Sequence, residues 1–85
     1  MRPEFDEATI RQLVTDQVEA MVGKPVKEND DLFDLGLTSM DATRLITWID
    51  ETFGTTVSLR AVFEGPEIGL LVTAIAQPPA AGEQI

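Results

Sequence analysis

The segment best placed to do chemistry is 31–40, which reads Asp-Leu-Phe-Asp-Leu-Gly-Leu-Thr-Ser-Met. Thr38 and Asp41 match the capping-box pattern Ser/Thr-x-x-Asp/Glu, which predicts that Thr38 caps a helix and that Ser39 is its first residue. Ser39 then has a hydroxyl that is not needed for capping, at the positive end of the helix dipole. A serine at a helix start is most often a cap and nothing more. Here the pattern favours a covalently attached phosphate on Ser39.

The sequence lacks the side chains that activate a serine for attack. No His and no Cys occur among the 85 residues, which excludes Ser-His and Cys-His mechanisms and zinc sites that use these ligands. Carboxylates remain, but so small a body has little room to bury two of them around a substrate. The acidic run 28–31 lacks the ligand spacing of an EF-hand. We therefore predict that the chain is not an enzyme, holds no metal, and is modified on Ser39 by another enzyme.

The net charge of the chain limits the classes of partner that it can bind. The net charge is −9, from 15 acidic and 6 basic side chains. Such a surface repels nucleic acid and anionic lipid and favours partners with basic patches, although solubility alone is the simpler interpretation. No apolar run approaches the roughly 18 residues of a membrane span, and the first residues lack the pattern of a signal peptide. We expect a cytoplasmic protein that binds neither nucleic acid nor membrane.

Helices have to position Ser39. Apolar residues at helical spacing predict three main helices and one short one, over about 7–22, 39–53, 67–76 and 59–64. Asp6 and Ser58 are the expected caps of the first and the short helix. The fold class is therefore all-α, a small four-helix bundle.

A long first loop joins the first two helices. Residues 24–37 show no sustained period, so the loop must be held by its own apolar side chains, chiefly Leu32, Phe33 and Leu35. The length of the chain indicates one domain, which we place at 1–77. The Pro/Ala/Gly-rich tail 78–85 is expected to be disordered.

Two segments resemble the phosphopantetheine-binding acyl and peptidyl carrier family. Residues 32–40 look like the attachment motif of this family, a Leu/Phe-x-x-Leu-Gly stretch before the modified serine and a bulky apolar residue. Residues 63–68, Phe-Glu-Gly-Pro-Glu-Ile, look like the Phe-x-x-Pro-x-Ile start of the fourth helix, which is commonest in peptidyl carriers. The resemblance covers about residues 10–76, and the two motifs together are far more specific than either alone.

The resemblance implies a covalent cofactor and a series of partners. Ser39 would receive 4′-phosphopantetheine from coenzyme A through a separate Mg²⁺-dependent phosphopantetheinyl transferase. The thiol of the arm would then carry an acyl or aminoacyl group as a thioester. An adenylating or acyltransferring enzyme would load it, and condensing or tailoring enzymes would act downstream, with the carrier a monomer.

The resemblance also implies a partner-binding face around Ser39. An exposed Met is adaptable and suits serial binding to several partners, and Met40 begins the outer face of the second helix, although packing on the loop is its alternative role. The carboxylates near Ser39 are either solvated or recognised by basic partners. The residues assigned to partner binding are Asp34, Leu37, Thr38, Met40, Asp41, Thr43 and Thr47.

The chain departs from the two main branches of this family. Fatty-acid carriers usually have Asp where Thr38 stands and more acidic residues along a helix in which Arg44 occurs here. Peptidyl carriers commonly have Gly-Gly-His before the serine, where this chain has Leu37 and Thr38. The combination is most like a free-standing carrier of a specialised-metabolite pathway, nonribosomal or polyketide. The alternative is a fatty-acid or polyketide synthase acyl carrier, and the remote alternative is an unmodified acidic interaction module.

Overall fold

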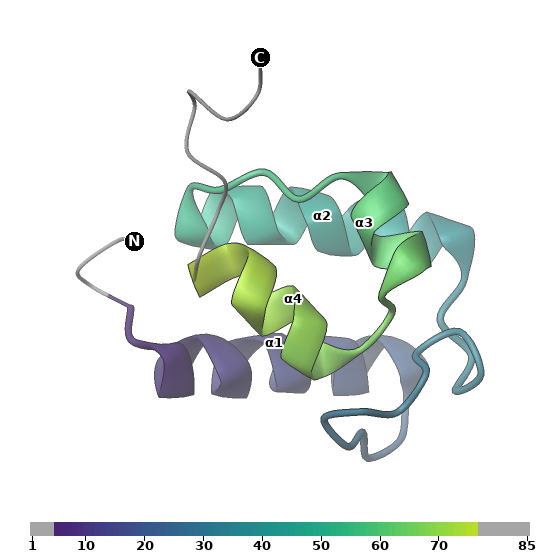
Figure 1. Ribbon diagram of the computed structural model, residues 1–85. Helices are drawn as coiled ribbons and strands as arrows, with labels where there is room; N and C mark the ends of the chain where they lie inside the picture. Colours follow the sequence, from purple (N-terminus) through teal and green to yellow (C-terminus); the bar gives the residue numbers. More distant parts are fainter. Residues whose placement is uncertain (1–4, 77–85) are drawn as a thin grey trace.

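The protein is all-helical over residues 5–76, the part of the chain that the computed structural model describes. Its helices are α1 (Glu7–Val22), α2 (Ser39–Phe53), α3 (Leu59–Glu64) and α4 (Ile68–Ala76). α1 and α2 lie along two sides of the bundle with α4 between them, and α3 lies beside α2 (Figure 1). The predicted four-helix fold is confirmed. The tail predicted over 78–85 and the domain boundary at 77 lie outside the described residues.

Three of the predicted helices have the observed bounds, and the fourth begins one residue later than predicted. The carbonyl of Glu67 accepts a hydrogen bond from the N–H of Leu71, at 3.0 Å, so Glu67 precedes α4 as its cap residue. Among the described residues, no helix has the length and apolar character needed to cross a membrane.

The predicted caps of α1 and α3 are both confirmed. Asp6 accepts a hydrogen bond from the N–H of Thr9 at 2.8 Å, and this bond lowers the pKa of the Asp6 carboxyl below its ordinary value. The hydroxyl of Ser58 accepts a hydrogen bond from the N–H of Ala61 at 3.0 Å. The Ser58 oxygen is therefore committed to holding the start of α3.

The core lies where the apolar faces of the helices meet, and α4 packs chiefly against α1. The buried side chains of α1, α2 and α4 are Ile10, Val14, Val18, Ala42, Leu45, Ile49, Phe53, Ile68, Leu71, Val72, Ile75 and Ala76. Full burial of each large apolar side chain stabilises the fold by about 1.5–3 kcal/mol. Phe53 also meets Phe5 and Trp48 edge to face, with ring centroids 5.0 and 5.6 Å away.

The first loop packs against the bundle through the predicted side chains and two others. Leu32 is fully buried, and the half-buried Phe33 and Leu35 pack against the core. Val26 and Leu37 are also buried. The N–H of Leu37 donates to the carbonyl of Leu32 at 3.0 Å, which turns Leu37 inward.

Hydrogen bonds tie the same loop to the connection between α3 and α4. The N–H of Leu32 donates to the carbonyl of Pro66 at 2.8 Å, and the N–H of Gly69 donates to the carbonyl of Glu28 at 3.1 Å. Both bonds join segments that are distant in the sequence. The loop and the start of α4 therefore hold each other in place.

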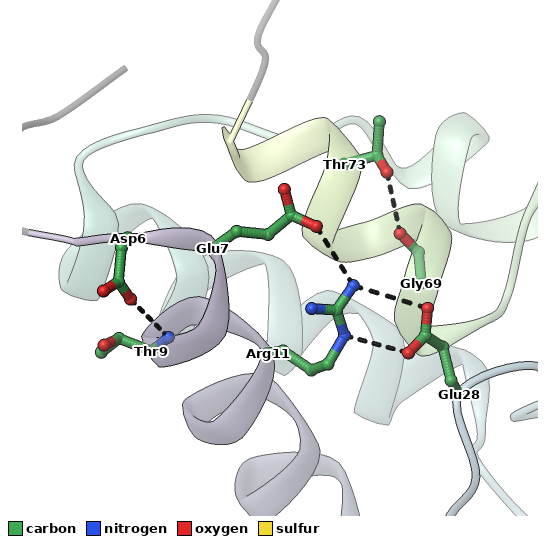
Figure 2. A network of polar contacts seen from close by, with 7 residues as sticks. All are labelled: Asp6, Glu7, Thr9, Arg11, Glu28, Gly69 and Thr73. Carbon is green, nitrogen blue, oxygen red and sulfur yellow. Dashed lines mark hydrogen bonds and ion pairs between the residues drawn. The ribbon is translucent and has the colours of Figure 1, made fainter.

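A polar cluster fastens the loop to α1 at the same point (Figure 2). The guanidinium of Arg11 lies 3.3 Å from the carboxylate of Glu7 and 3.0 Å from that of Glu28. The hydrogen bond that Arg11 donates to Glu7 and the attraction of Glu28 raise the pKa of Arg11, so Arg11 stays charged. A Cβ on Gly69 would lie 2.9 Å from the carboxylate oxygen of Glu28. The position therefore has no room for a side chain while Glu28 faces Arg11.

We predict that the effect of Gly69→Ala depends on Glu28. In a Glu28→Ala background the substitution should stabilise α4, because Ala exceeds Gly in helix propensity by up to about 1 kcal/mol. In the wild type the contact with Glu28 should cancel or reverse this gain, which gives a coupling energy of about 0.5 kcal/mol or more. Urea unfolding of both single variants and the double variant measures it. Equal effects of Gly69→Ala in the two backgrounds would show that Glu28 does not occupy this space.

Candidate functional site

The start of α2 is built by a turn that brings the chain from the core to the surface. Gly36 has a φ of 110°, a region that side-chain-bearing residues rarely adopt, and apart from Gly36 and its two chain neighbours no atom lies within 4 Å of where its Cβ would be. Leu37 then enters the core with 3% of its surface exposed. The backbone conformation of Gly36 thus allows one residue to be buried two positions before an exposed serine.

The predicted capping box is present at this helix start. The hydroxyl oxygen of Thr38 accepts a hydrogen bond from the N–H of Asp41 at 3.0 Å, and the carboxylate of Asp41 accepts one from the N–H of Thr38 at 3.1 Å. Thr38 is therefore the cap and Ser39 the first residue of α2. Ser39 is exposed, and within residues 5–76 its hydroxyl makes no hydrogen bond.

The outer face of α2 continues from Ser39 with a thioether, a guanidinium and two threonines. Met40 is 65% exposed, and its sulfur lies 3.6 Å from the guanidinium of Arg44. Thr43 and Thr47 are also exposed, and their hydroxyls donate to the carbonyls of Ser39 and Thr43, each at 3.2 Å. Because these hydroxyls are used within the helix, the two threonines offer mainly methyl groups, beside the thioether of Met40 and the guanidinium of Arg44.

Most of the predicted partner-binding residues are exposed, with one exception. Asp34, Thr38, Met40, Thr43 and Thr47 are exposed, and Asp41 is half-buried. Leu37 does not belong to this surface, since its side chain lies in the core. The motif predicts a contact residue at Leu37, but the turn at Gly36 directs this side chain inward.

Sequence reasoning missed an apolar surface on the neighbouring helix α3. Leu59 and Phe63 stand one turn apart and are 40% and 46% exposed, while Val62 is the buried residue of this helix. The ring of Phe63 stacks on that of Phe33 from the first loop, with centroids 5.2 Å apart. Leu59, Val62 and Phe63 stand at the i, i+3, i+4 spacing of one helical face, so no signal in the sequence separates the two exposed residues from the buried one.

Among the described residues, no group of three or more acidic side chains could hold a metal ion. The groups available at the site are thus an exposed serine hydroxyl, a helix start and an apolar face. A phosphate bonded to Ser39 would meet the positive end of the α2 dipole, an interaction that contributes about 0.3–1 kcal/mol. The residues present fit a covalently attached phosphopantetheine group.

Comparison with known proteins places the chain in a family. Residues 6–75 match the model of the phosphopantetheine attachment site family. The chain belongs to this family, whose members hold a covalent 4′-phosphopantetheine group and are carriers rather than enzymes.

Curated relatives come from fungal nonribosomal peptide synthetases. The chain is 44% identical over 54 residues to the nonribosomal peptide synthetase hkm10 of Aspergillus hancockii, which is 60% of this chain and 5% of that protein. It is 33% identical over 66 residues to the beauvericin nonribosomal cyclodepsipeptide synthetase BEA1 of Gibberella fujikuroi, which is 78% of this chain and 2% of that protein. The chain thus matches a small part of each relative.

Solved structures give the same fold. The HMG-ACPI domain of the CurA module from Lyngbya majuscula superposes with a TM-score of 0.75 at 23% identity, over 91% of this chain and 84% of that one. The nonribosomal peptide synthetase FmoA3 in its AMPPNP-bound form has a TM-score of 0.71 at 36% identity, over 88% of this chain and 8% of that one. The chain is therefore a phosphopantetheine-attachment carrier domain related to those of nonribosomal peptide synthetases.

We predict that Gly36→Asn destabilises the fold by about 1–3 kcal/mol, because only Gly adopts this backbone conformation without strain. Gly23→Asn is the matched control, since Gly23 ends α1 at a φ of 75° and a ψ of 25°, which Asn tolerates. Urea unfolding measures both variants. Equal losses at the two positions would contradict the strain argument.

Proposed function

We propose that Ser39 is the residue that carries 4′-phosphopantetheine. This proposal rests on the different hydrogen bonding of the two serines of the sequence, Ser39 and Ser58. The Ser58 oxygen caps α3, whereas Thr38 caps α2 and leaves the Ser39 hydroxyl exposed. Ser39 is thus the serine with an available hydroxyl at the start of a long helix.

The arm on Ser39 would supply a thiol that holds an acyl or aminoacyl group as a thioester. The chain itself would hold the arm and be recognised in turn by the transferase, by an adenylating or acyltransferring loading enzyme, and by condensing or tailoring enzymes. The relatives named above favour a nonribosomal peptide or hybrid polyketide pathway over fatty-acid synthesis. The free-standing state, the monomer and the cytoplasmic location stay predictions.

Recognition would use the outer face of α2. Met40, Thr43 and Thr47 follow Ser39 along α2, and Asp34 is exposed on the first loop. A flexible, exposed Met adapts to partners of different shape, and an acidic chain attracts partners with basic rims. The same face would thus serve several enzymes in succession.

The first prediction here concerns the site of attachment. Incubation with coenzyme A, Mg²⁺ and a phosphopantetheinyl transferase should add the mass of one phosphopantetheine arm to the wild type and to Ser58→Ala, but not to Ser39→Ala. Intact-mass and peptide-mapping spectrometry measure it. Ser58→Ala loses a cap worth about 1 kcal/mol, so circular dichroism must show both variants folded at the assay temperature. Modification of Ser39→Ala would overturn the assignment, and an unmodified wild type would support the interaction-module alternative.

The second prediction concerns the partner face. Met40→Ala should raise the KM for the transferase about five-fold, the loss of roughly 1 kcal/mol of apolar contact, with little change in Tm because Met40 is exposed. Leu70→Ala on α4 is the matched control, since Leu70 is 51% exposed but lies on another helix. A large loss of Tm with an unchanged KM would instead assign Met40 to packing.

A further inference from the structure

Thr38 and Asp41 enclose Ser39 within a closed loop of hydrogen bonds. The two reciprocal bonds between them, at 3.0 and 3.1 Å, join the residue before Ser39 to the residue two positions after it. Asp41 is half-buried, and one of its carboxylate oxygens already accepts the N–H of Thr38. One oxygen of each side chain is thus bonded to a backbone N–H on the other side of Ser39.

Two buried residues that flank this capping box also hold the turn in place. Leu37 and Ala42 stand immediately before the cap and at the fourth helical position, where a hydrophobic staple fixes the entry of the chain. They are 3% and 0% exposed. The N–H of Ala42 donates to the carbonyl of Thr38 at 2.9 Å, and Leu37 bonds back to Leu32. The backbone of Ser39 is therefore fixed at both ends, and its hydroxyl keeps only the rotation about its own side-chain bond.

We propose that Thr38 and Asp41 are positioning residues for the modification of Ser39, rather than contacts for partner enzymes. The inference rests on the proposed attachment at Ser39. In that reaction a bond forms between the Ser39 oxygen and the phosphorus next to the pantetheine of coenzyme A. The bond from this phosphorus to the adenosine bisphosphate leaving group breaks, and the hydroxyl proton passes to a base of the transferase. A fixed hydroxyl enters this step without first having to be ordered.

A contact role and a positioning role make opposite demands on the Asp41 side chain. A basic residue of a partner would require the negative charge. The capping box requires only an oxygen that accepts the N–H of Thr38, which Asn also supplies. In the same way, Ser supplies the oxygen of Thr38, and Val has the shape of Thr without that oxygen. Two pairs of variants therefore separate geometry from charge and from side-chain volume.

The experiment measures kcat and KM for a phosphopantetheinyl transferase with coenzyme A on Thr38→Ser, Thr38→Val, Asp41→Asn and Asp41→Ala. Thr38→Val and Asp41→Ala should lower kcat roughly 10- to 100-fold, the scale of a misplaced reacting group, with little change in KM. Thr38→Ser and Asp41→Asn should stay close to the wild type. Hydrogen exchange gives a readout without the transferase, since the N–H of Asp41 should lose protection in Thr38→Val and keep it in Thr38→Ser.

Controls separate this proposal from a loss of stability and from a wrong attachment site. Ser58→Ala removes the equivalent cap of α3 and should lower Tm without lowering kcat. If Thr38→Val does not fold, the Asp41 pair decides. Asp41→Asn as impaired as Asp41→Ala, a rise in KM alone, or a normal kcat in Thr38→Val would each overturn positioning. A wild type modified elsewhere than Ser39 would overturn the attachment site itself.

Discussion

The site depends on closing the first turn of α2 without using the Ser39 hydroxyl. A helix start leaves backbone N–H groups without partners inside the helix, and a serine placed there ordinarily supplies its own oxygen. Thr38 takes this role one residue earlier, and Asp41 completes the pair from within the first turn. The contrast with Ser58, which caps α3 with its own hydroxyl, shows both solutions in one chain. The hydroxyl of Ser39 stays available because the Thr38 oxygen accepts the N–H of Asp41 in its place.

That local arrangement is oriented by contacts that are distant in the sequence. The first loop ends at Leu37, and its course is fixed by the bond from Leu32 to Pro66 and by that from Gly69 to Glu28. The loop therefore moves with the start of α4 and, through the stacked rings of Phe33 and Phe63, with α3. The helix cap sets the conformation of the turn, whereas these bonds set its place on the body.

The sequence predicted the features that depend on neighbouring residues. Helix bounds follow from apolar spacing, and the caps at Asp6, Thr38 and Ser58 follow from residue type and position, so these were found. The burial of Leu37 was not found, because it depends on the turn at Gly36 and on a bond to Leu32. The ion pair between Arg11 and Glu28 needs two segments that only the fold brings together.

The short helix α3 is a second case in which the sequence alone did not predict which side chains are exposed. Six residues give too little sequence to define a period, so the exposed Leu59 and Phe63 could not be told from core residues. A short helix with one buried side chain contributes little to its own stability, and most helical stability in proteins comes from tertiary packing. Its place beside α2 is therefore set by Val62 and by the contact with Phe33, which the spacing of residues within α3 does not contain.

The net charge of the chain and the side chains on the outer face of α2 act at different distances from a partner. A net charge of −9 keeps copies of the chain apart and draws in partners with basic surfaces. Next to Ser39, however, the outer face of α2 carries Met40 and Arg44, with Thr hydroxyls bonded to the helix backbone. In the proposed role, long-range charge would favour encounter with basic partners, whereas close contact near Ser39 would combine the adaptable thioether of Met40 with the guanidinium of Arg44.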